Sequence, residues 1–299
     1  MYRIGIVIVN YNGIIHNQEC IDSILNSSYS NIEIIIVDNK SVDSSIEELE
    51  RIYNENITVI KNTENLGFAG GTNIGIKYAI SNGCDYVLLL NNDTVIDKNM
   101  IGYMLKTSRE NYNAVVSPKI YYYEPSNVIW SAGGEINWNR GYTIQYGMGK
   151  IDNGQWDDKR EVSFATGCCI LIPRRVIEKV GLIQEEYFLY FEDTDYCVNI
   201  RKCGFKIIYE PMAKMYHKVS ATTGGDNNIN YVYYIIRNRL LFNHKYNNNK
   251  VIPYVYILLS IMKKCAVWIF RKRYDLVKCS IIAIYDFKKK VNGKKEKIL

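Results

Sequence analysis

The chain has 299 residues, of which 47% are hydrophobic and 23% are charged, so it can bury a full core and is too apolar to be disordered. Its net charge of +6 is unevenly placed: residues 251–299 hold twelve Lys and Arg against three acids, and the first 250 residues carry a surplus of three acids. This distribution excludes a generic nucleic-acid binder, whose body would be basic, and we expect no nucleic-acid partner.

Strands and helices alternate through the first 117 residues. Apolar runs of strand length are followed in turn by segments with the apolar spacing of a helix. This alternation predicts βαβ units and a mostly parallel central sheet with flanking helices, which is an α/β fold. Strands are expected over residues 3–9, 32–37, 57–61, 86–90 and 114–117, and helices over residues 18–26, 46–53, 72–81 and 97–110.

The pattern changes after Pro118. Residues 121–159 are rich in Tyr, Trp, Gly and Asn and have no clean periodicity, which predicts loops and short antiparallel strands. Order returns over residues 162–172. Helices are then expected over residues 174–180, 194–203 and 231–246, a last strand over residues 206–209, and two further helices in the tail. We therefore expect a domain over residues 1–245 and a basic helical extension over residues 246–299.

The run Tyr86–Leu90 stops in Asn91, Asn92 and Asp93. A continuous apolar strand predicts burial on both faces of the sheet, and ligands of open α/β sheets gather at the carboxyl ends of such strands. A carboxylate there can bind a divalent cation, which in turn can bind a diphosphate. Taken alone, an ordinary polar turn explains the same residues equally well.

Two more loops are expected at the same edge. Asp38 ends the second strand, and its carboxylate can accept the ring N–H of uracil or thymine, whereas adenine offers only a bare N1. Residues 65–73, which carry three glycines, open a helix whose N-terminus favours phosphate. A single glycine-rich loop is more often a turn than a site, so the convergence of three loops is the signal.

Acidic and basic side chains in the second half add to this edge. One acidic group consists of Glu192, Asp193 and Asp195. These acids either suit the start of a helix, where negative charge is favoured, or supply a general base whose pKa is raised beside the aromatic run 187–191. His217 is an ordinary histidine unless a cation lies at Asp93, in which case it becomes a second ligand. Arg237 and Arg239 are two residues apart on a helix, so at most one of them meets a phosphate.

The tail is amphipathic and basic. Trp268, Phe270 and Tyr274 alternate with Lys and Arg, which suits an anionic membrane surface, although a helix packed on the domain is an equal alternative. The apolar run 251–262 contains Pro253 and has twelve residues, whereas a bilayer span needs about 20. Because no signal peptide is evident and the cysteines suit a reducing compartment, we expect a cytoplasmic protein, or one peripheral at the inner face of the cell membrane.

Six motifs in this order resemble those of the inverting family 2 glycosyltransferases with a GT-A fold, closest to the rhamnosyltransferase-like, non-processive members. The resemblance covers roughly residues 1–245 and implies a nucleotide-binding half over residues 1–117 and an acceptor-binding half over residues 118–245. The motifs are Val9-Asn10-Tyr11-Asn12, Val37-Asp38-Asn39, Asn65-x-Gly67-Phe68, Asn91-x-Asp93, Glu192-Asp193 and His217.

The resemblance also implies a role for each matching residue. Asp193 falls at the catalytic base, and Asp93 with His217 falls at a site for Mn²⁺ or Mg²⁺. Asn91 replaces the first acid of the family's D-x-D motif and removes a negative charge there; together with Glu192 and Asp195 it is an additional candidate. The implied nucleotide-sugar-binding set is Asn10, Asn12, Asp38, Asn65, Gly67, Asn73, Asn92 and Arg237.

The expected activity is transfer of a sugar from a UDP- or dTDP-linked donor, dTDP-rhamnose among them, to a hydroxyl of a glycan, a lipid-linked glycan or a protein. Two alternatives stay open. A sugar-phosphate nucleotidyltransferase typically has a basic residue directly after its first strand, and residues 10–15 contain none. A non-catalytic module would only bind a nucleotide sugar or a membrane surface.

Overall fold

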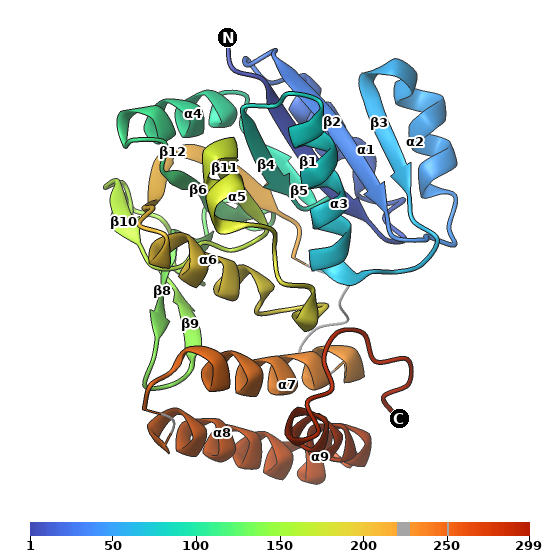
Figure 1. Ribbon diagram of the computed structural model, residues 1–299, viewed down its shortest axis with the longest axis vertical. Helices are drawn as coiled ribbons and strands as arrows, with labels where there is room; N and C mark the ends of the chain where they lie inside the picture. The colour runs from blue at the N-terminus through green and yellow to red at the C-terminus, as the bar shows by residue number, and fades with distance from the viewer. Residues whose placement is uncertain (220–227, 250) are drawn as a thin grey trace.

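A computed structural model describes residues 1–219, 228–249 and 251–299. Its centre is a mixed sheet in the order β10-β12-β6-β11-β4-β1-β2-β3, with β5 paired to β12 and β7 paired to β6; β8 and β9 form a separate hairpin (Figure 1). The strands are β1 (Ile4–Asn10), β2 (Ile32–Asp38), β3 (Ile57–Lys61), β4 (Tyr86–Leu90), β5 (Thr94–Ile96), β6 (Val115–Tyr122), β7 (Ile129–Ser131), β8 (Gly134–Asn137), β9 (Tyr142–Gln145), β10 (Arg160–Val162), β11 (Cys169–Pro173) and β12 (Ile207–His217).

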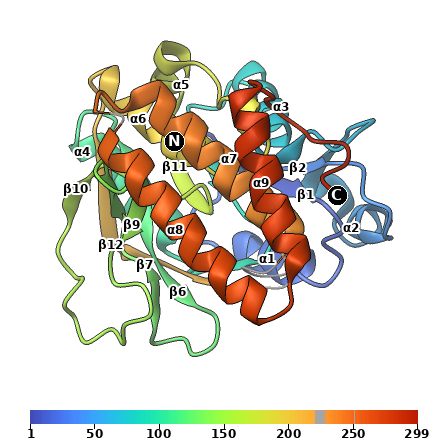
Figure 2. The same cartoon turned by 90° about the horizontal axis from the view of Figure 1, so that it is seen from below.

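The helices form two layers on the sheet and a third beneath it. Helices α1, α2 and α4 share one core with the sheet, α3, α5 and α6 share another, and α7, α8 and α9 lie below the edge where β1–β4 end (Figures 1 and 2). The helices are α1 (Asn17–Leu25), α2 (Ser45–Tyr53), α3 (Gly67–Ser81), α4 (Met100–Glu110), α5 (Arg174–Val180), α6 (Glu192–Lys202), α7 (Ile229–Tyr246), α8 (Val251–Phe270) and α9 (Tyr274–Lys288), with short 3₁₀ helices η1 (Asn54–Asn56) and η2 (Glu185–Tyr187).

Strand β4 is buried on both faces, as its unbroken apolar sequence predicts. Val87 and Leu89 face one core, and Tyr86, Leu88 and Leu90 face the other. Parallel pairing holds from β4 through β1 and β2 to β3. On the other side of β4 the antiparallel strand β11 lies between β4 and β6, so the sheet is mixed rather than continuously parallel.

Two elements extend further than the sequence predicts. Helix α3 begins at Gly67 instead of Thr72, and its glycines allow it to lie against the sheet: a Cβ on Gly71 would lie 3.0 Å from Val9, and one on Gly75 would lie 2.3 Å from Val7. Strand β12 continues past Tyr209 to His217, with an irregularity between Glu210 and Lys214. His217 therefore lies on a strand, paired with Thr94 of β5, and not in the loop that the sequence suggests.

The C-terminal extension has no separate core. Its buried side chains, including Ile257, Trp268 and Leu276, pack with those of α7. Helix α8 is continuous over 20 residues, with Pro253 in its first turn, where a proline is tolerated. By length and composition α8 is the one candidate for a membrane span in the described part of the chain, and 22% of the relevant window is buried.

Candidate active site

A chain of side-chain amides joins the ends of β1, β2 and β4. Asn10 Nδ2 donates to Asp38 Oδ1 at 3.0 Å, and Asn10 Oδ1 accepts from Asn17 Nδ2 at 2.7 Å. Asn17 Oδ1 in turn accepts from Asn92 Nδ2 at 2.9 Å. A Cβ on Gly13 would clash with Asn10, Asn17 and Asn92, so the loop that follows β1 lies directly against this chain. The network fixes the relative positions of Asp38 and the segment that contains Asp93.

The loops after β1 and β2 are also bound to each other. Ser41 Oγ donates to Asp38 Oδ1 at 2.6 Å and accepts from the Asn12 backbone N–H at 2.9 Å. Asn12 Oδ1 accepts from the backbone of Val42 at 2.9 Å. Asp38 is only 6% exposed, and Oδ2 accepts one hydrogen bond, from the Ser41 backbone at 3.1 Å. This oxygen keeps a lone pair with which to accept from a ligand.

The start of α3 contacts both this network and the second half of the chain. Asn65 Oδ1 accepts from the Gly67 backbone at 2.9 Å, and Asn39 Nδ2 donates to the Gly67 carbonyl at 2.8 Å. Gly67 has a φ of +73°, and any Cβ there would lie 2.2 Å from the Phe188 carbonyl oxygen. The Phe68 backbone donates to that same oxygen at 2.9 Å. Glycine is therefore required by both backbone conformation and space.

Asp93 and His217 form a buried pair at the ends of β4 and β12. Asp93 Oδ1 lies 3.1 Å from His217 Nε2, and both side chains are less than a tenth exposed. The Trp130 ring packs edge-on against the imidazole, with ring centroids 4.5 Å apart. Burial opposes the charge on each group, but polar neighbours outweigh it. His217 lowers the pKa of Asp93, and nearby Cys168 together with Asp93 raises the pKa of His217 to about 10.

The geometry of this pair fits a divalent cation. Two neighbouring ligands of an octahedral Mg²⁺, each at about 2.1 Å, are about 3 Å apart, and the Asp93 and His217 atoms are separated by 3.1 Å. Asp93 Oδ1 is buried, and apart from the ion-pair contact with His217 Nε2 it has no hydrogen-bond partner within the described residues. Residues 1–219, 228–249 and 251–299 contain no group of three or more acidic, His or Cys side chains placed to hold a metal ion together. Asp93 and His217 are therefore the two described side chains that would hold such an ion.

Asp193, in the first turn of α6, lies at the same edge. Its Oδ2 accepts from the Gly167 backbone at 3.0 Å, and its Oδ1 accepts from the Thr194 backbone at 2.6 Å. Cys168, which follows Gly167, accepts a hydrogen bond from the Asn91 backbone N–H through its carbonyl oxygen at 2.9 Å. A short path of backbone hydrogen bonds therefore connects Asp193 to the segment that carries Asp93.

Burial sets the protonation of the two adjacent acids. It raises the pKa of Glu192 to about 8, with a further contribution from the neighbouring charge of Asp193. It also raises the pKa of Asp193, although the N–H groups of Gly167 and Thr194 partly offset this shift. Glu192 Oε2 is buried without a partner in the described part of the chain. At neutral pH Glu192 is therefore largely in its neutral form.

The structure gives three of the expected site residues different contacts. Asn73 is buried and binds both backbone groups of Ile183, so it joins α3 to the segment before η2. Asp195 is wholly buried and accepts from Tyr187, Asn199 and Lys245.

Arg237 is 1% exposed, and its guanidinium donates to the carbonyls of Tyr187 and Gly293 instead of pointing to a phosphate. These three polar groups are used within the protein, which the sequence could not reveal.

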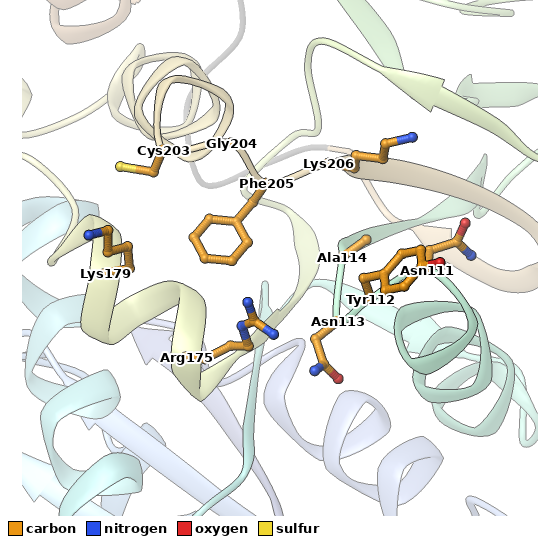
Figure 3. A pocket seen from close by; sticks show the side chains of 10 residues that line it. All are labelled: Asn111, Tyr112, Asn113, Ala114, Arg175, Lys179, Cys203, Gly204, Phe205 and Lys206. Atoms are coloured by element: carbon orange, nitrogen blue, oxygen red, sulfur yellow. The ribbon is translucent and has the colours of Figure 1, made fainter.

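Two cavities lie at opposite edges of the sheet. One cavity of about 400 Å³ adjoins the Asp93–His217 pair and is lined by Tyr122, Tyr123 and His217 among others. The other, of about 550 Å³, lies where β6 and β12 begin, and Figure 3 shows Arg175, Lys179 and Phe205 around it. None of its lining residues is an expected site residue. Of the two cavities, only the first is lined by an expected site residue, His217.

Sequence reasoning missed several residues that organise this edge. Asn17 directly precedes the helix expected over residues 18–26 and was given no role, although its buried amide joins Asn10 to Asn92. Gly167 precedes a strand without any motif, yet its N–H contacts Asp193. Asn238 escaped notice because its role depends on contacts between α7 and a distant turn. Only Asn17, a polar residue directly before an apolar helix, left a signal in the sequence.

Comparison with known proteins identifies the family. The profile of Glycosyl transferase family 2 matches residues 5–181. The hexosyltransferase Agl10 of low-salt glycan biosynthesis in Haloferax volcanii is 26% identical over 87% of this chain and 81% of its own. The dTDP-rhamnosyl transferase RfbF of Shigella flexneri is 24% identical over 96% of both chains.

A solved structure supports the fold. The crystal structure of GalNAc-T7 with UDP, GalNAc and Mn²⁺ superposes with a TM-score of 0.60 at 15% identity, over 79% of this chain and 48% of that one. At this identity the likeness speaks for the fold alone, which is GT-A. The chain belongs to glycosyl transferase family 2 and is a glycosyltransferase with a GT-A fold, similar to rhamnosyltransferases.

Proposed function

We propose that the protein transfers a sugar, with inversion, from a UDP- or dTDP-linked donor to a hydroxyl of a glycan, lipid-linked glycan or protein acceptor. The observation that carries the proposal is the meeting of three groups at one edge: Asp38 in its amide network, the Asp93–His217 pair, and Asp193 on the backbone path through Gly167. dTDP-rhamnose is the donor that the name of RfbF suggests.

In this mechanism the chain's own residues bind the donor and move one proton. Asp38 accepts the base N–H, while Asn10, Asn12, Asn65, Gly67 and Asn92 line the nucleotide. Asp193 takes the proton of the acceptor hydroxyl as that oxygen attacks the anomeric carbon from the face opposite the leaving group. Asp93 and His217 would hold Mn²⁺ or Mg²⁺, and such an ion would supply Lewis-acid stabilisation of the departing nucleoside diphosphate. A single displacement inverts the anomeric configuration.

The test is to incubate the protein with UDP- and dTDP-sugars and Mn²⁺ and to measure the released phosphate species. Release of a nucleoside diphosphate supports the proposal, and NMR of the glycoside product should give the inverted anomer. Release of pyrophosphate would instead indicate a nucleotidyltransferase. Donor binding with no turnover against any glycan or lipid-linked acceptor would favour a binding module.

We expect Asp38→Asn to weaken UDP or dTDP binding by roughly 10- to 100-fold, because a hydrogen bond to a charged acceptor contributes about 1.5–3 kcal/mol. The substitution keeps the shape of the side chain and removes the charge. Isothermal titration with UDP measures the change. Asp43→Asn, in the same loop, is the matched control and should bind as the wild type does; equal affinities in all three proteins would contradict the role of Asp38.

We also propose that α8 places the protein on an anionic membrane at the cytoplasmic face. Its outward side exposes Ile252, Val255, Leu259, Met262 and Ile269 at helical spacing. Lys263, Lys264 and residues 271–273 add positive charge around this stripe. The other side of α8 is buried against α7 and α9 through Ile257, Ile261 and Trp268. This burial favours a helix that lies flat on the membrane over one that crosses the bilayer. Since this layer lies beneath the catalytic edge, the arrangement suits a lipid-linked acceptor (Figure 2).

The double substitution Leu259→Glu with Met262→Glu should reduce co-sedimentation with vesicles rich in phosphatidylglycerol several-fold, because it places two acids on the lipid-facing stripe. Met148→Glu with Ile151→Glu is the control, since these two residues are equally exposed and also three apart. Unchanged sedimentation of the first double variant would reject the membrane surface. A concentration-dependent dimer broken by the same change would assign the stripe to a second copy.

A further inference from the structure

The turn before the catalytic helix has an uncommon backbone. Phe188, Tyr190 and Phe191 have φ values of 63°, 66° and 74°. Bulky residues rarely adopt positive φ, and such conformations persist only where the surroundings hold them. Phe191 is the residue that precedes α6, and Asp193 follows two positions later. The position of Asp193 therefore depends on what holds this turn.

Asn238 of α7 holds the turn from below. It is fully buried, and its Nδ2 lies within hydrogen-bond distance of three carbonyl oxygens of the turn: Tyr187 at 2.9 Å, Leu189 at 2.8 Å and Tyr190 at 2.9 Å. Its Oδ1 accepts from Arg237 Nε at 2.9 Å, which fixes the amide so that its NH₂ group faces the turn. The side chain is thus oriented for this one set of contacts.

Arg237 extends the support to the C-terminal segment. It donates to the Tyr187 carbonyl at 3.0 Å and to the Gly293 carbonyl at 2.7 Å. The Gly293 backbone donates in turn to the Glu186 carbonyl at 2.7 Å. The opposite side of the turn contacts the donor loop, where the Phe188 carbonyl accepts from the Phe68 backbone. The turn is thus enclosed between α7, the chain's last residues and the start of α3.

We propose that Asn238 is a positioning residue for the transfer reaction, which acts through the carbonyls of residues 187–191 to hold Asp193 against the acceptor site. The inference rests on the proposed role of Asp193 as base. Asn238 itself lies below the turn and reaches no reacting atom. Its loss should therefore lower kcat and leave the KM for the donor nearly unchanged, because Asp38, Asp93 and His217 are held by other contacts.

The test is Asn238→Asp, which keeps the shape and the bond from Arg237 but places an oxygen against the three carbonyls. We expect kcat to fall by up to about 100-fold, the effect of a displacement near 1 Å at a reacting group, with the donor KM within about 3-fold. Asn243→Asp is the matched control: Asn243 is also fully buried on α7, and its Nδ2 donates to the carbonyls of Gly141 and Arg239.

The control should lose thermal stability to a similar extent and keep its kcat. Equal kcat losses in the two variants, or an unchanged kcat in Asn238→Asp, would overturn the proposal. If Asn238→Asp does not fold, Asn238→Ser keeps one donor and is measured in the same way: a lower kcat at constant KM supports the inference, and an unchanged kcat rejects it. Asp193→Asn, assayed beside them, separates the two ideas, because full activity there refutes the base itself.

Discussion

Asp193→Asn should reduce kcat by about 10²- to 10⁴-fold, the usual contribution of a general base, while UDP or dTDP binding stays intact. The amide keeps the shape of the carboxylate and can still accept a hydrogen bond from the Gly167 N–H, whose nitrogen lies 3.0 Å from Asp193 Oδ2 in the wild-type protein. It cannot accept the proton of the acceptor hydroxyl. Steady-state kinetics and calorimetry with the nucleoside diphosphate separate these two effects.

The adjacent acid provides the comparison for this result. Because burial raises the pKa of Glu192 to about 8, Glu192→Gln replaces a largely neutral acid with a neutral amide and should lose far less activity than Asp193→Asn. A larger loss in Glu192→Gln than in Asp193→Asn would transfer the role of base to Glu192.

The pH dependence follows from the raised pKa of Asp193. A base works only when deprotonated, so kcat should fall as the pH drops through that raised value, above the ordinary value of about 3.9 for Asp.

Asp93→Asn should lower kcat/KM by about 10²-fold or more, since a group that stabilises charge on a leaving diphosphate contributes about that much. Asp93 Oδ1 and His217 Nε2 are 3.1 Å apart, and the substitution removes the only carboxylate of that pair. The Mn²⁺ concentration needed for half-maximal activity should rise in parallel. A titration of initial rate against Mn²⁺ measures both quantities.

Asp97→Asn is the matched change for this experiment. Asp97 lies four residues further along the chain, and its Oδ1 accepts from the Asn99 backbone, a bond that an amide can also accept. This variant should keep its rate and its Mn²⁺ requirement. If chelation of divalent cations leaves the wild-type rate unchanged, and Asp93→Asn keeps that rate, the metal site is refuted.

The first half of the fold, in which strands and helices alternate along the chain, could be predicted from the sequence. The apolar run 86–90 matched β4 without error in its bounds, because a strand buried on both faces must be apolar at every position. The run 57–61 also matched the bounds of β3, although β3 is an edge strand and is only partly buried. The antiparallel pairing of β11 with β4 could not be predicted. Its five apolar residues look the same for either direction, and long-range pairing decides between them.

Sequence order alone determined that carboxylates and amides end the strands of an α/β sheet, since Asn10 and Asp38 close apolar runs and Asp93 follows one after two asparagines. Their chemistry follows from residue type and chain direction, both of which are local. Only the tertiary structure decided that Asn17 joins the amides, that Arg237 binds carbonyls instead of phosphate, and that Asn238 holds the turn before Asp193. A buried polar side chain takes whatever partner the packing brings within about 3 Å, and that partner lies far away in sequence.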